Sequence, residues 1–337
     1  MTKRTQICSS LAVLAVLSMF SASLSGQAAA PALAGDVAAA KTSRPAQVPE
    51  DFVITPFGYF HPSCVLEIEE GEKLLADGRV KHVDGAVDAN GPACSYPHYT
   101  PSGSLAPTEV TGVSGATLAN MAPVISGWLE YVSATTSTSY GKITATWTVP
   151  PLPATNDGQI LFFFPGFEDT SDILSIVQPV LQFGDSSAGG ANYWALASWN
   201  CCITGTMWHS HLLKVNPGDA ILGEITSTCK KGLNYCADWK VISEDQTIGR
   251  KTSLDKAVAE GQVWNWGFGA VAEVYGVKQC SDWPANTTST LFTVQLYDQN
   301  REAISDPGWT GSPANGDTNP SCNYGLNVTD TQETLEY

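Results

Sequence analysis

The chain of 337 residues is poor in positive charge, with 17 Lys and Arg against 33 Asp and Glu and a formal net charge of −16. Nucleic acids and anionic membrane surfaces attract basic proteins, so neither is an expected partner. Long apolar runs are also lacking. Past residue 34 no stretch approaches the roughly 20 apolar residues that a membrane-spanning helix needs, so we expect no membrane span.

The common catalytic and cofactor motifs are missing too. The chain has no GxSxG, no HExxH, no P-loop and no dinucleotide-binding fingerprint. His209 and His211 lie two apart on an expected strand, so both point to one face and could supply two metal ligands. No third ligand lies nearby, so we expect structural histidines there, and neither a metal nor another cofactor.

The N-terminus has the composition of a secretory signal peptide. Lys3 and Arg4 precede the apolar run Leu11–Leu17, and small residues then lead to Ala32-Leu33-Ala34. We expect residues 1–34 to be removed and the protein to be secreted. The remaining chain has a formal net charge of about −18, which suits a protein that works where carboxylates become protonated.

Eight of the nine cysteines remain after Cys8 leaves with the signal peptide. An even number in an exported chain indicates disulfides, and no pair of CxxC spacings supports the rival, a zinc site. We expect the pairs Cys64–Cys94 and Cys229–Cys236, with the adjacent Cys201 and Cys202 reaching Cys280 and Cys322.

The chain divides into a small N-terminal part and a larger C-terminal one. Residues 35–50 are rich in Ala, Pro and Ser, a strand is expected at Cys64–Ile68, and residues 89–113 have the composition of a linker. We expect 35–121 to be a prosegment or an accessory unit with its linker. Residues 122–337 form the main domain.

Short strand-like runs separated by turn signals fill the main domain. They predict an all-β fold, a concanavalin-like β-sandwich of two large antiparallel sheets. Only 252–260 suggests a helix. The expected strands are 127–133, 140–149, 159–164, 173–183, 192–200, 206–215, 220–228, 238–244, 270–275 and 291–299.

Residues 161–184 (LFFFPGFEDTSDILSIVQPVLQFG) combine two apolar runs with an acidic loop at 168–172. The second run contains the amides of Gln178 and Gln182. A buried amide is costly unless it is hydrogen-bonded. Gln178 therefore either has a buried partner or faces a functional groove, and Glu168 is either a solvated loop residue or one wall of that groove.

Glu273 is the one carboxylate in the apolar run GAVAEVYGV at 269–277. Alternation places Val271, Glu273 and Tyr275 on one face. Buried Glu is rare unless it is paired, so Glu273 is either paired in a core, set in a groove, or an ordinary edge residue.

Together these segments resemble the eqolisin family of glutamic peptidases. Similar motifs follow in the family's order: Ser126-Gly127-Trp128, YGKITATWTVP at 140–150, the turn at 217–221, and Ala272-Glu273-Val274. Gln178 stands twelve residues after Gly166, which is the family's spacing from Gly to the catalytic Gln. The resemblance covers roughly 126–300. Departures include Phe164 in place of a Trp, Gln182 near an Asp position, Ser198 where a Glu is usual, and Gly276 where a second acid is expected.

The resemblance implies a secreted acid endopeptidase that uses a Gln/Glu dyad and an activated water. Glu273 would be the general base and later the acid, kept ionised by a lowered pKa. Gln178 would position the water and stabilise the oxyanion. Phe164, Glu168, Gln182 and Trp199 are further expected contacts to the substrate.

The expected partner is a protein or peptide substrate, and the expected state is a monomer. The implied geometry is that the side chains of Gln178 and Glu273 meet across neighbouring strands on one concave face. Two rivals stay open. A glycoside-active enzyme could pair Glu273 with Glu168 or Glu224, and a non-catalytic carbohydrate-binding protein could use the ten Trp residues for sugar stacking.

Overall fold

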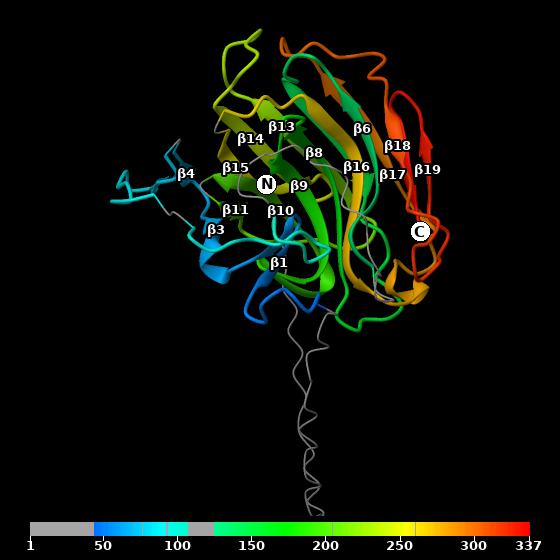
Figure 1. Ribbon diagram of the computed structural model, residues 1–337. Coiled ribbons are helices and arrows are strands. Elements are labelled where there is room, and N and C mark those ends of the chain that lie inside the picture. The colour runs from blue at the N-terminus through cyan, green and yellow to red at the C-terminus, as the bar shows by residue number, and fades with distance from the viewer. Residues whose placement is uncertain (1–43, 76, 92–93, 107–124, 204, 260) are drawn as a thin grey trace, which may run out of the picture. The chain divides into compact units, whose positions relative to one another are not determined.

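Two large sheets make up the main domain (Figure 1). The computed structural model describes residues 44–75, 77–91, 94–106, 125–203, 205–259 and 261–337. The larger sheet runs in the order β18 (Thr310–Ser312), β6 (Ile125–Thr135), β16 (Trp266–Val277), β8 (Ile160–Asp169), β9 (Asp172–Ser186), β10 (Gly189–Ile203), β11 (Thr206–Ser210) and β3 (Val65–Ile68), with β12 (Leu213–Lys214) paired to β10.

The smaller sheet has the order β15 (Arg250–Val258), β14 (Asp238–Asp245), β13 (Ala220–Ser227), β7 (Lys142–Thr148), β17 (Ser289–Tyr297), β20 (Gln332–Glu336) and β19 (Gly325–Val328). All of its pairings are antiparallel. The predicted all-β sandwich of two large sheets is therefore confirmed.

The core between the sheets follows from strict alternation along the strands. In β7, Ile143, Ala145 and Trp147 are buried, while the threonines between them face outward. Aromatic rings from both sheets fill this layer: Phe163, Phe167 and Trp194 meet Trp239 and Phe292. Burying such rings gives roughly 1.5–3 kcal/mol each in transfer free energy, so this layer holds the two sheets together.

Strand limits differ from the sequence expectations in several places, among them the expected strand 206–215, which is two strands, β11 and β12. The strand expected at 159–164 continues through Pro165-Gly166 to Asp169, so Glu168 and Asp169 are strand residues and the turn shrinks to Thr170-Ser171. The helix suggested at 252–260 is wrong, because that segment pairs with β14 as β15. Strands β18, β19 and β20 carry no clear alternation and were not expected.

The N-terminal segment is part of the same compact unit, Ala39–Tyr337. It contains a hairpin of β1 (Val53–Thr55) and β2 (Gly58–Phe60), a 3-10 turn η1 (Pro62–Cys64), and a second hairpin of β4 (Lys73–Leu74) and β5 (Val80–Lys81). Its strand β3 pairs in parallel with β11 and extends the larger sheet.

Part of the expected linker is folded. Tyr99 forms a bridge with Tyr59 of β2 on one side and with Leu105 on the other. The rest of the expected boundary, residues 107–124, lies outside the described residues, as does the expected signal peptide. Within the described ranges the only helices are η1 and η2 (Cys280–Asp282), and none could span a membrane.

Four disulfides join the eight cysteines. The expected pairs Cys64–Cys94 and Cys229–Cys236 are confirmed. The expectation for the other four is wrong, because Cys201 bonds to Cys202 and Cys280 bonds to Cys322. Cys201 lies on the face of the larger sheet that points away from the smaller sheet, whereas Cys322 packs against the core between the sheets. The two cysteines are therefore on opposite sides of the larger sheet.

Candidate active site

The face of the larger sheet that points away from the smaller one carries a second apolar cluster, which we call the outer face. Its floor is aromatic and aliphatic and belongs to four adjacent strands, β16, β8, β9 and β10. The fully buried residues of this floor include Phe162, Phe164, Val180, Trp199, Phe268, Val271 and Tyr275. An apolar floor this large needs a cover, and the chain supplies one.

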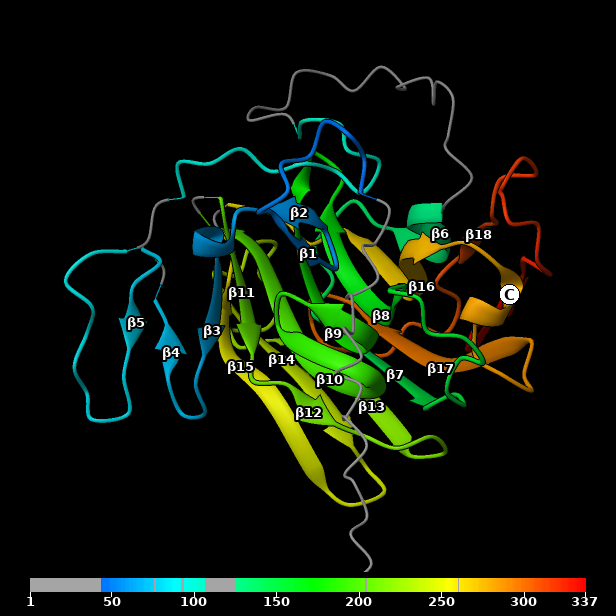
Figure 2. The ribbon, with the colours of Figure 1, turned by 90° about the horizontal axis from the view of Figure 1, so that it is seen from below.

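The cover is the hairpin β1–β2 (Figure 2). Ile54, Tyr59 and Phe60 are buried against the floor. The Tyr59 ring meets the Tyr275 ring edge-on, with 5.4 Å between centroids. The carbonyl of Ile54 accepts a hydrogen bond from the Ser187 amide at 2.8 Å, which ties β1 to the turn between β9 and β10.

Gln178 lies on β9 at the centre of this face. It pairs with Trp199 of β10 on one side, and the register of β8 places Gly166 opposite it on the other. Its Nε2 donates to the carbonyl oxygen of Pro56, in the turn between β1 and β2, at 2.6 Å. Its Oε1 is buried and has no hydrogen-bond partner among the described residues. The buried amide group of Gln178, which would be costly without a hydrogen bond, is therefore paired with a peptide carbonyl.

Glu273 lies on β16, on the same face. The Tyr275 hydroxyl donates to Oε1 at 2.6 Å, and the Trp128 indole of β6 donates to Oε2 at 2.9 Å. The side chain is fully buried, and this burial raises the pKa of the Glu273 carboxyl to about 8, although both hydrogen bonds act to lower it. The expected lowered pKa is therefore wrong for the covered state, because the hairpin keeps water away.

Gln178 and Glu273 share a face but do not touch. Strand β8 lies between β9 and β16, so the expectation of neighbouring strands is wrong. Phe162 of β8 pairs with Glu273 on one side and with Gln182 on the other. Gln182 is thus the residue of β9 that is level with Glu273 across the sheet, and Gln178 lies four residues away from it along β9. No hydrogen bond joins the side chains of Gln178 and Glu273.

The turn of the hairpin connects the two groups. Its Pro56 carbonyl meets Gln178, and two residues later the Gly58 backbone hydrogen-bonds the Tyr275 phenol that holds Glu273. The turn therefore contacts the amide of Gln178 directly and the carboxyl group of Glu273 through the Tyr275 phenol.

The further residues expected to contact substrate behave differently from one another. Phe164 belongs to the floor, with its ring 6.0 Å from that of Trp128, and Trp199 lies beside Gln178. Glu168 sits at the end of β8, on the same face as Gly166, and is 5% exposed. Gln182 is committed to local structure: its Nε2 donates to the carbonyls of Gly184 and Gly189, and its Oε1 accepts from Ser186.

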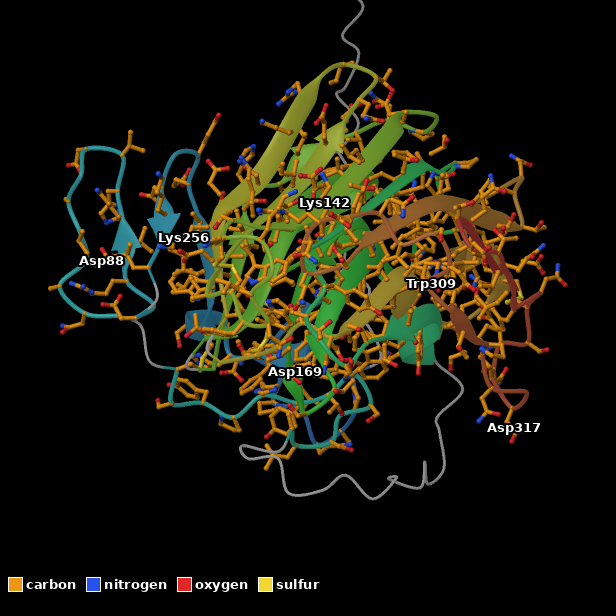
Figure 3. All side chains as sticks on the ribbon, turned by 90° about the horizontal axis from the view of Figure 1, so that it is seen from above. Asp88, Lys142, Asp169, Lys256, Trp309 and Asp317 are labelled. Atoms are coloured by element: carbon orange, nitrogen blue, oxygen red, sulfur yellow. A yellow bond between two sulfur atoms is a disulfide. The ribbon has the colours of Figure 1, made fainter. Side chains whose placement is uncertain are left out.

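Asp169, labelled in Figure 3, also has a structural task. Its carboxylate accepts hydrogen bonds from the amide and hydroxyl of Ser171 and from the amide of Val263. These bonds close the turn after β8 and fix the strand that carries Glu168 and Gly166.

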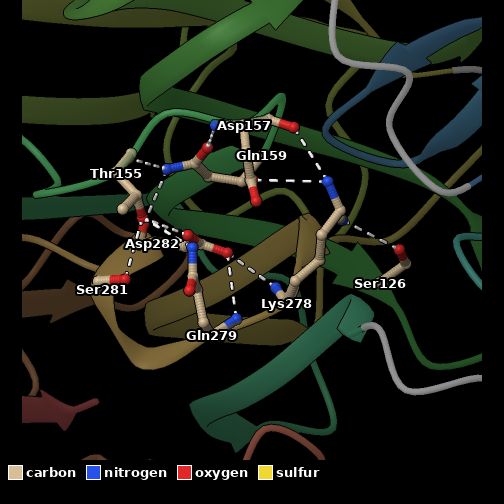
Figure 4. A network of polar contacts seen from close by, with 9 residues as sticks. Ser126, Thr155, Asp157, Gln159, Lys278, Gln279, Ser281 and Asp282 are labelled. Atoms are coloured by element: carbon tan, nitrogen blue, oxygen red, sulfur yellow. Dashed lines mark hydrogen bonds and ion pairs between the residues drawn. The ribbon is translucent and has the colours of Figure 1, made fainter.

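The far end of β16 is fixed by a polar network (Figure 4). The buried carboxylate of Asp282 accepts from the backbone amide of Lys278 at 2.8 Å and from the Thr155 hydroxyl. The Lys278 ammonium donates to the carbonyl of Asp157 at 3.0 Å. This network lies a few residues beyond Tyr275, so it helps to hold the phenol and Glu273 in place.

The histidines considered as metal ligands, and Glu224 considered as a second carboxylate, have other contacts in the structure. His209 is buried against Trp199, with Nδ1 2.9 Å from the Ser210 carbonyl, while His211 contacts Thr252. In the described ranges no cluster of three or more potential metal ligands occurs. Glu224 pairs with Lys142 at 2.6 Å on the smaller sheet, so it is not a partner for Glu273.

A crystal structure of scytalido-glutamic peptidase with a peptide-based transition-state analogue superposes with a TM-score of 0.46 and 14% identity, over 64% of this chain and 99% of that one. The chain is similar, at low identity, to the eqolisin family. No protein-family model and no curated protein sequence matches it.

Two further solved structures belong to the same group. SCP-B, a member of the eqolisin peptidases in complex with the tripeptide Ala-Ile-His, gives a TM-score of 0.44 at 14% identity, covering 64% of this chain and 99% of that one. Aspergilloglutamic peptidase from Aspergillus niger gives 0.32 at 16% identity, covering 53% and 98%. This is the family that the sequence motifs indicated.

Sequence analysis missed three contributors to the site. Trp128 and Tyr275 bind the two oxygens of Glu273, and Pro56 occupies Gln178. The alternation of β16 did place Tyr275 on the face of Glu273. Nothing in the sequence connects Pro56 with Gln178, because 122 residues separate them.

Proposed function

We propose that the chain is a secreted acid endopeptidase of the glutamic type, with Gln178 and Glu273 as its catalytic pair. The observation that carries this proposal is the 2.6 Å hydrogen bond from Gln178 Nε2 to the carbonyl oxygen of Pro56. An amide that donates to a peptide carbonyl on an apolar, water-excluding floor is placed to stabilise the oxyanion of a tetrahedral intermediate.

Glu273 takes the role of base and later of acid. Its carboxyl group is oriented by two donors on its two oxygens, which fixes its direction as a proton acceptor requires. Since β8 separates it from Gln178, a substrate and its attacking water lie between them, over Phe162. Gly166 adds no side chain opposite Gln178, which leaves that part of the floor open to a peptide backbone.

The covered form is inactive for two reasons. Pro56 occupies the amide of Gln178, and burial under the hairpin raises the pKa of Glu273 to about 8, so that in acid the group is protonated and cannot act as a base. Removal of the hairpin admits water, which lowers the pKa of the carboxyl group toward its ordinary value. We therefore assign residues 35–121 as an inhibitory prosegment that is released in acid.

The proposed secretion draws on the N-terminal composition and on four disulfides, which form in oxidising compartments. The formal net charge of −16 and the family resemblance of the motifs support work at acid pH on protein substrates.

The test is cleavage of casein after the purified chain has been incubated in acid. Gln178→Ala and Glu273→Ala should each lose cleavage while circular dichroism shows an intact fold. Gln246→Ala and Glu244→Ala provide matched controls, because both residues lie in or beside β14, in the other sheet. Full activity in both site variants would rule out the pair.

A further inference from the structure

The hairpin β1–β2 must leave the outer face before a substrate can bind there, and one side chain is placed to control that step. We propose that His98 is an acid-sensitive latch that clamps β2 onto the outer face and opens when its imidazole is protonated. This proposal rests on the proposed function only in that the surface it uncovers holds Gln178 and Glu273.

His98 packs directly against strand β2 of the hairpin. Its ring stacks on the ring of Phe60, with centroids 4.7 Å apart and planes within 6°. Phe60 is 1% exposed and belongs to the apolar cluster of the outer face. The ring of His98 thus seals a residue that is itself packed in the site.

The backbone beside His98 is bonded to the same strand. The amide of Tyr59 donates to the carbonyl of Tyr99 at 2.7 Å, and the amide of Tyr99 donates back at 2.9 Å. Gly58, which precedes Tyr59, has a φ of +120°, and a Cβ there would lie 2.2 Å from the Tyr99 carbonyl oxygen. Segment 98–100 and β2 are therefore in close backbone contact and can only part together with the ring stack.

No charge compensates a proton on His98. Within the described ranges its ring has no hydrogen-bond or ion-pair partner, and burial is the sole cause that lowers the pKa of His98, to about 4. The charged groups nearest along the hairpin face elsewhere: His61 lies 3.7 Å from Asp51, and Arg44 lies over the Tyr59 ring. A proton on the stacked ring would thus sit on an apolar surface without a counter-ion.

The direction of the pH dependence of closure follows from the lowered pKa of His98. The closed state binds the proton more weakly than a solvated imidazole with a pKa of 6.5. The contribution of His98 to closure is therefore complete above about pH 6.5 and is lost as the pH falls toward 4. With these two pKa values, protonation of His98 by itself favours opening on the order of 100-fold between pH 7 and pH 4. Glu273 acts in the opposite direction, because the cover raises the pKa of its carboxyl group to about 8 and so favours closure in acid. The contribution of His98 is therefore measured as the difference between the wild type and a chain without this imidazole.

The other histidines of this segment would not give this response. His82 lies between Glu72 and Asp88, at 2.6 and 2.8 Å, and these carboxylates raise its pKa to about 9. His61 has Asp51 and Ser63 as partners. His82 can therefore carry a proton at little cost. His61 has polar partners where His98 has none, which makes His61 a matched control for His98.

The experiment is hydrogen exchange with mass spectrometry on the full chain at pH 7 and pH 4, with protection factors corrected for intrinsic rates. On acidification, peptides covering residues 53–60 and 98–100 of the wild type should lose protection on the order of 100-fold relative to the same peptides of His98→Phe, while β9 and β10 stay protected in both proteins. His98→Phe keeps a stackable ring that cannot titrate and retains Glu273, so it is the reference for this comparison. His61→Phe should respond as the wild type does.

A His98→Phe chain whose acid response matches that of the wild type overturns the latch. His98→Tyr serves as a second non-titrating ring if the Phe variant does not fold, as judged by protection of β9 at pH 7. The readout needs no catalysis, so a chain that opens in acid but cleaves nothing would refute the proposed function and leave the latch standing. An active chain in which His98→Phe responds to acid as the wild type does would do the reverse.

Discussion

Replacing Glu273 by Gln should remove a large part of the sensitivity of the fold to alkaline pH. The carboxyl group is fully buried, and burial raises its pKa from 4.5 to about 8. A carboxyl group with a raised pKa in the folded state contributes stability that is complete below about pH 4.5 and is lost as the pH rises through 8. The shift corresponds to about 5 kcal/mol, lost at about 1.4 kcal/mol per pH unit.

Gln is close in shape and cannot ionise. Its oxygen can accept from the Trp128 indole and its amide can donate to the Tyr275 oxygen, so both contacts of Glu273 have a replacement. Burial also raises the pKa of Glu130 to about 8 and that of Glu333 well above its usual value. Those two groups titrate in both proteins, so the difference between wild type and variant isolates Glu273.

The assay is urea unfolding of both proteins at pH 4.5, 6, 8 and 9. The unfolding free energy of the wild type relative to Glu273→Gln should fall by about 2 kcal/mol between pH 4.5 and 6, and by about 4 kcal/mol between pH 4.5 and 8. The exposed Glu302 supplies the control, because Glu302→Gln should show no such trend. A difference between wild type and Glu273→Gln that is constant across this range would refute the reasoning.

The hairpin and the floor give three more predictions. Gly58→Ala should loosen the hairpin at neutral pH, since a Cβ there meets a backbone carbonyl at 2.2 Å, and amide exchange at residues 53–60 will measure it. Gln182→Ala should cost roughly 1–3 kcal/mol in urea unfolding because it removes the buried hydrogen bonds of Gln182 to the Gly184 carbonyl and the Ser186 hydroxyl, whereas Gln178→Ala should chiefly remove casein cleavage. Tyr275→Phe deletes a bond that lowers the pKa of Glu273, so the pH–rate profile of casein cleavage should move to higher pH.

The fold could be predicted wherever one face of a strand is buried and the other is wet. The period of two in Lys142–Thr148 places its strand within a residue or two. Arg250–Val258 lacks that pattern, so the strand there could be recognised only from its pairing with β14 in the structure. The Pro-Gly pair at 165–166 indicated an end, yet β8 runs through it with the same register to β9 before and after the pair, where Phe163 lies opposite Leu181 and Phe167 opposite Val177.

The site could be predicted in its members but not in its arrangement. An amide in an apolar run marked Gln178, and a lone carboxylate among small residues marked Glu273. Their positions relative to β8 depend on the order of strands in the sheet, which the local sequence does not encode. The raised pKa of Glu273 likewise depends on a hairpin more than 200 residues earlier in the chain.

The disulfides have a consequence for how firmly the site stays covered. Cys64–Cys94 closes within the N-terminal segment, and the other three bonds close within the sandwich. A single cut in residues 107–124 would therefore leave two pieces with no covalent link between them. Before the cut the hairpin meets its face at an effective concentration on the order of millimolar, as for a short tether. After the cut that value falls to the actual concentration of the protein, so dilution alone would favour the open site, and a crowded solution would favour the closed one.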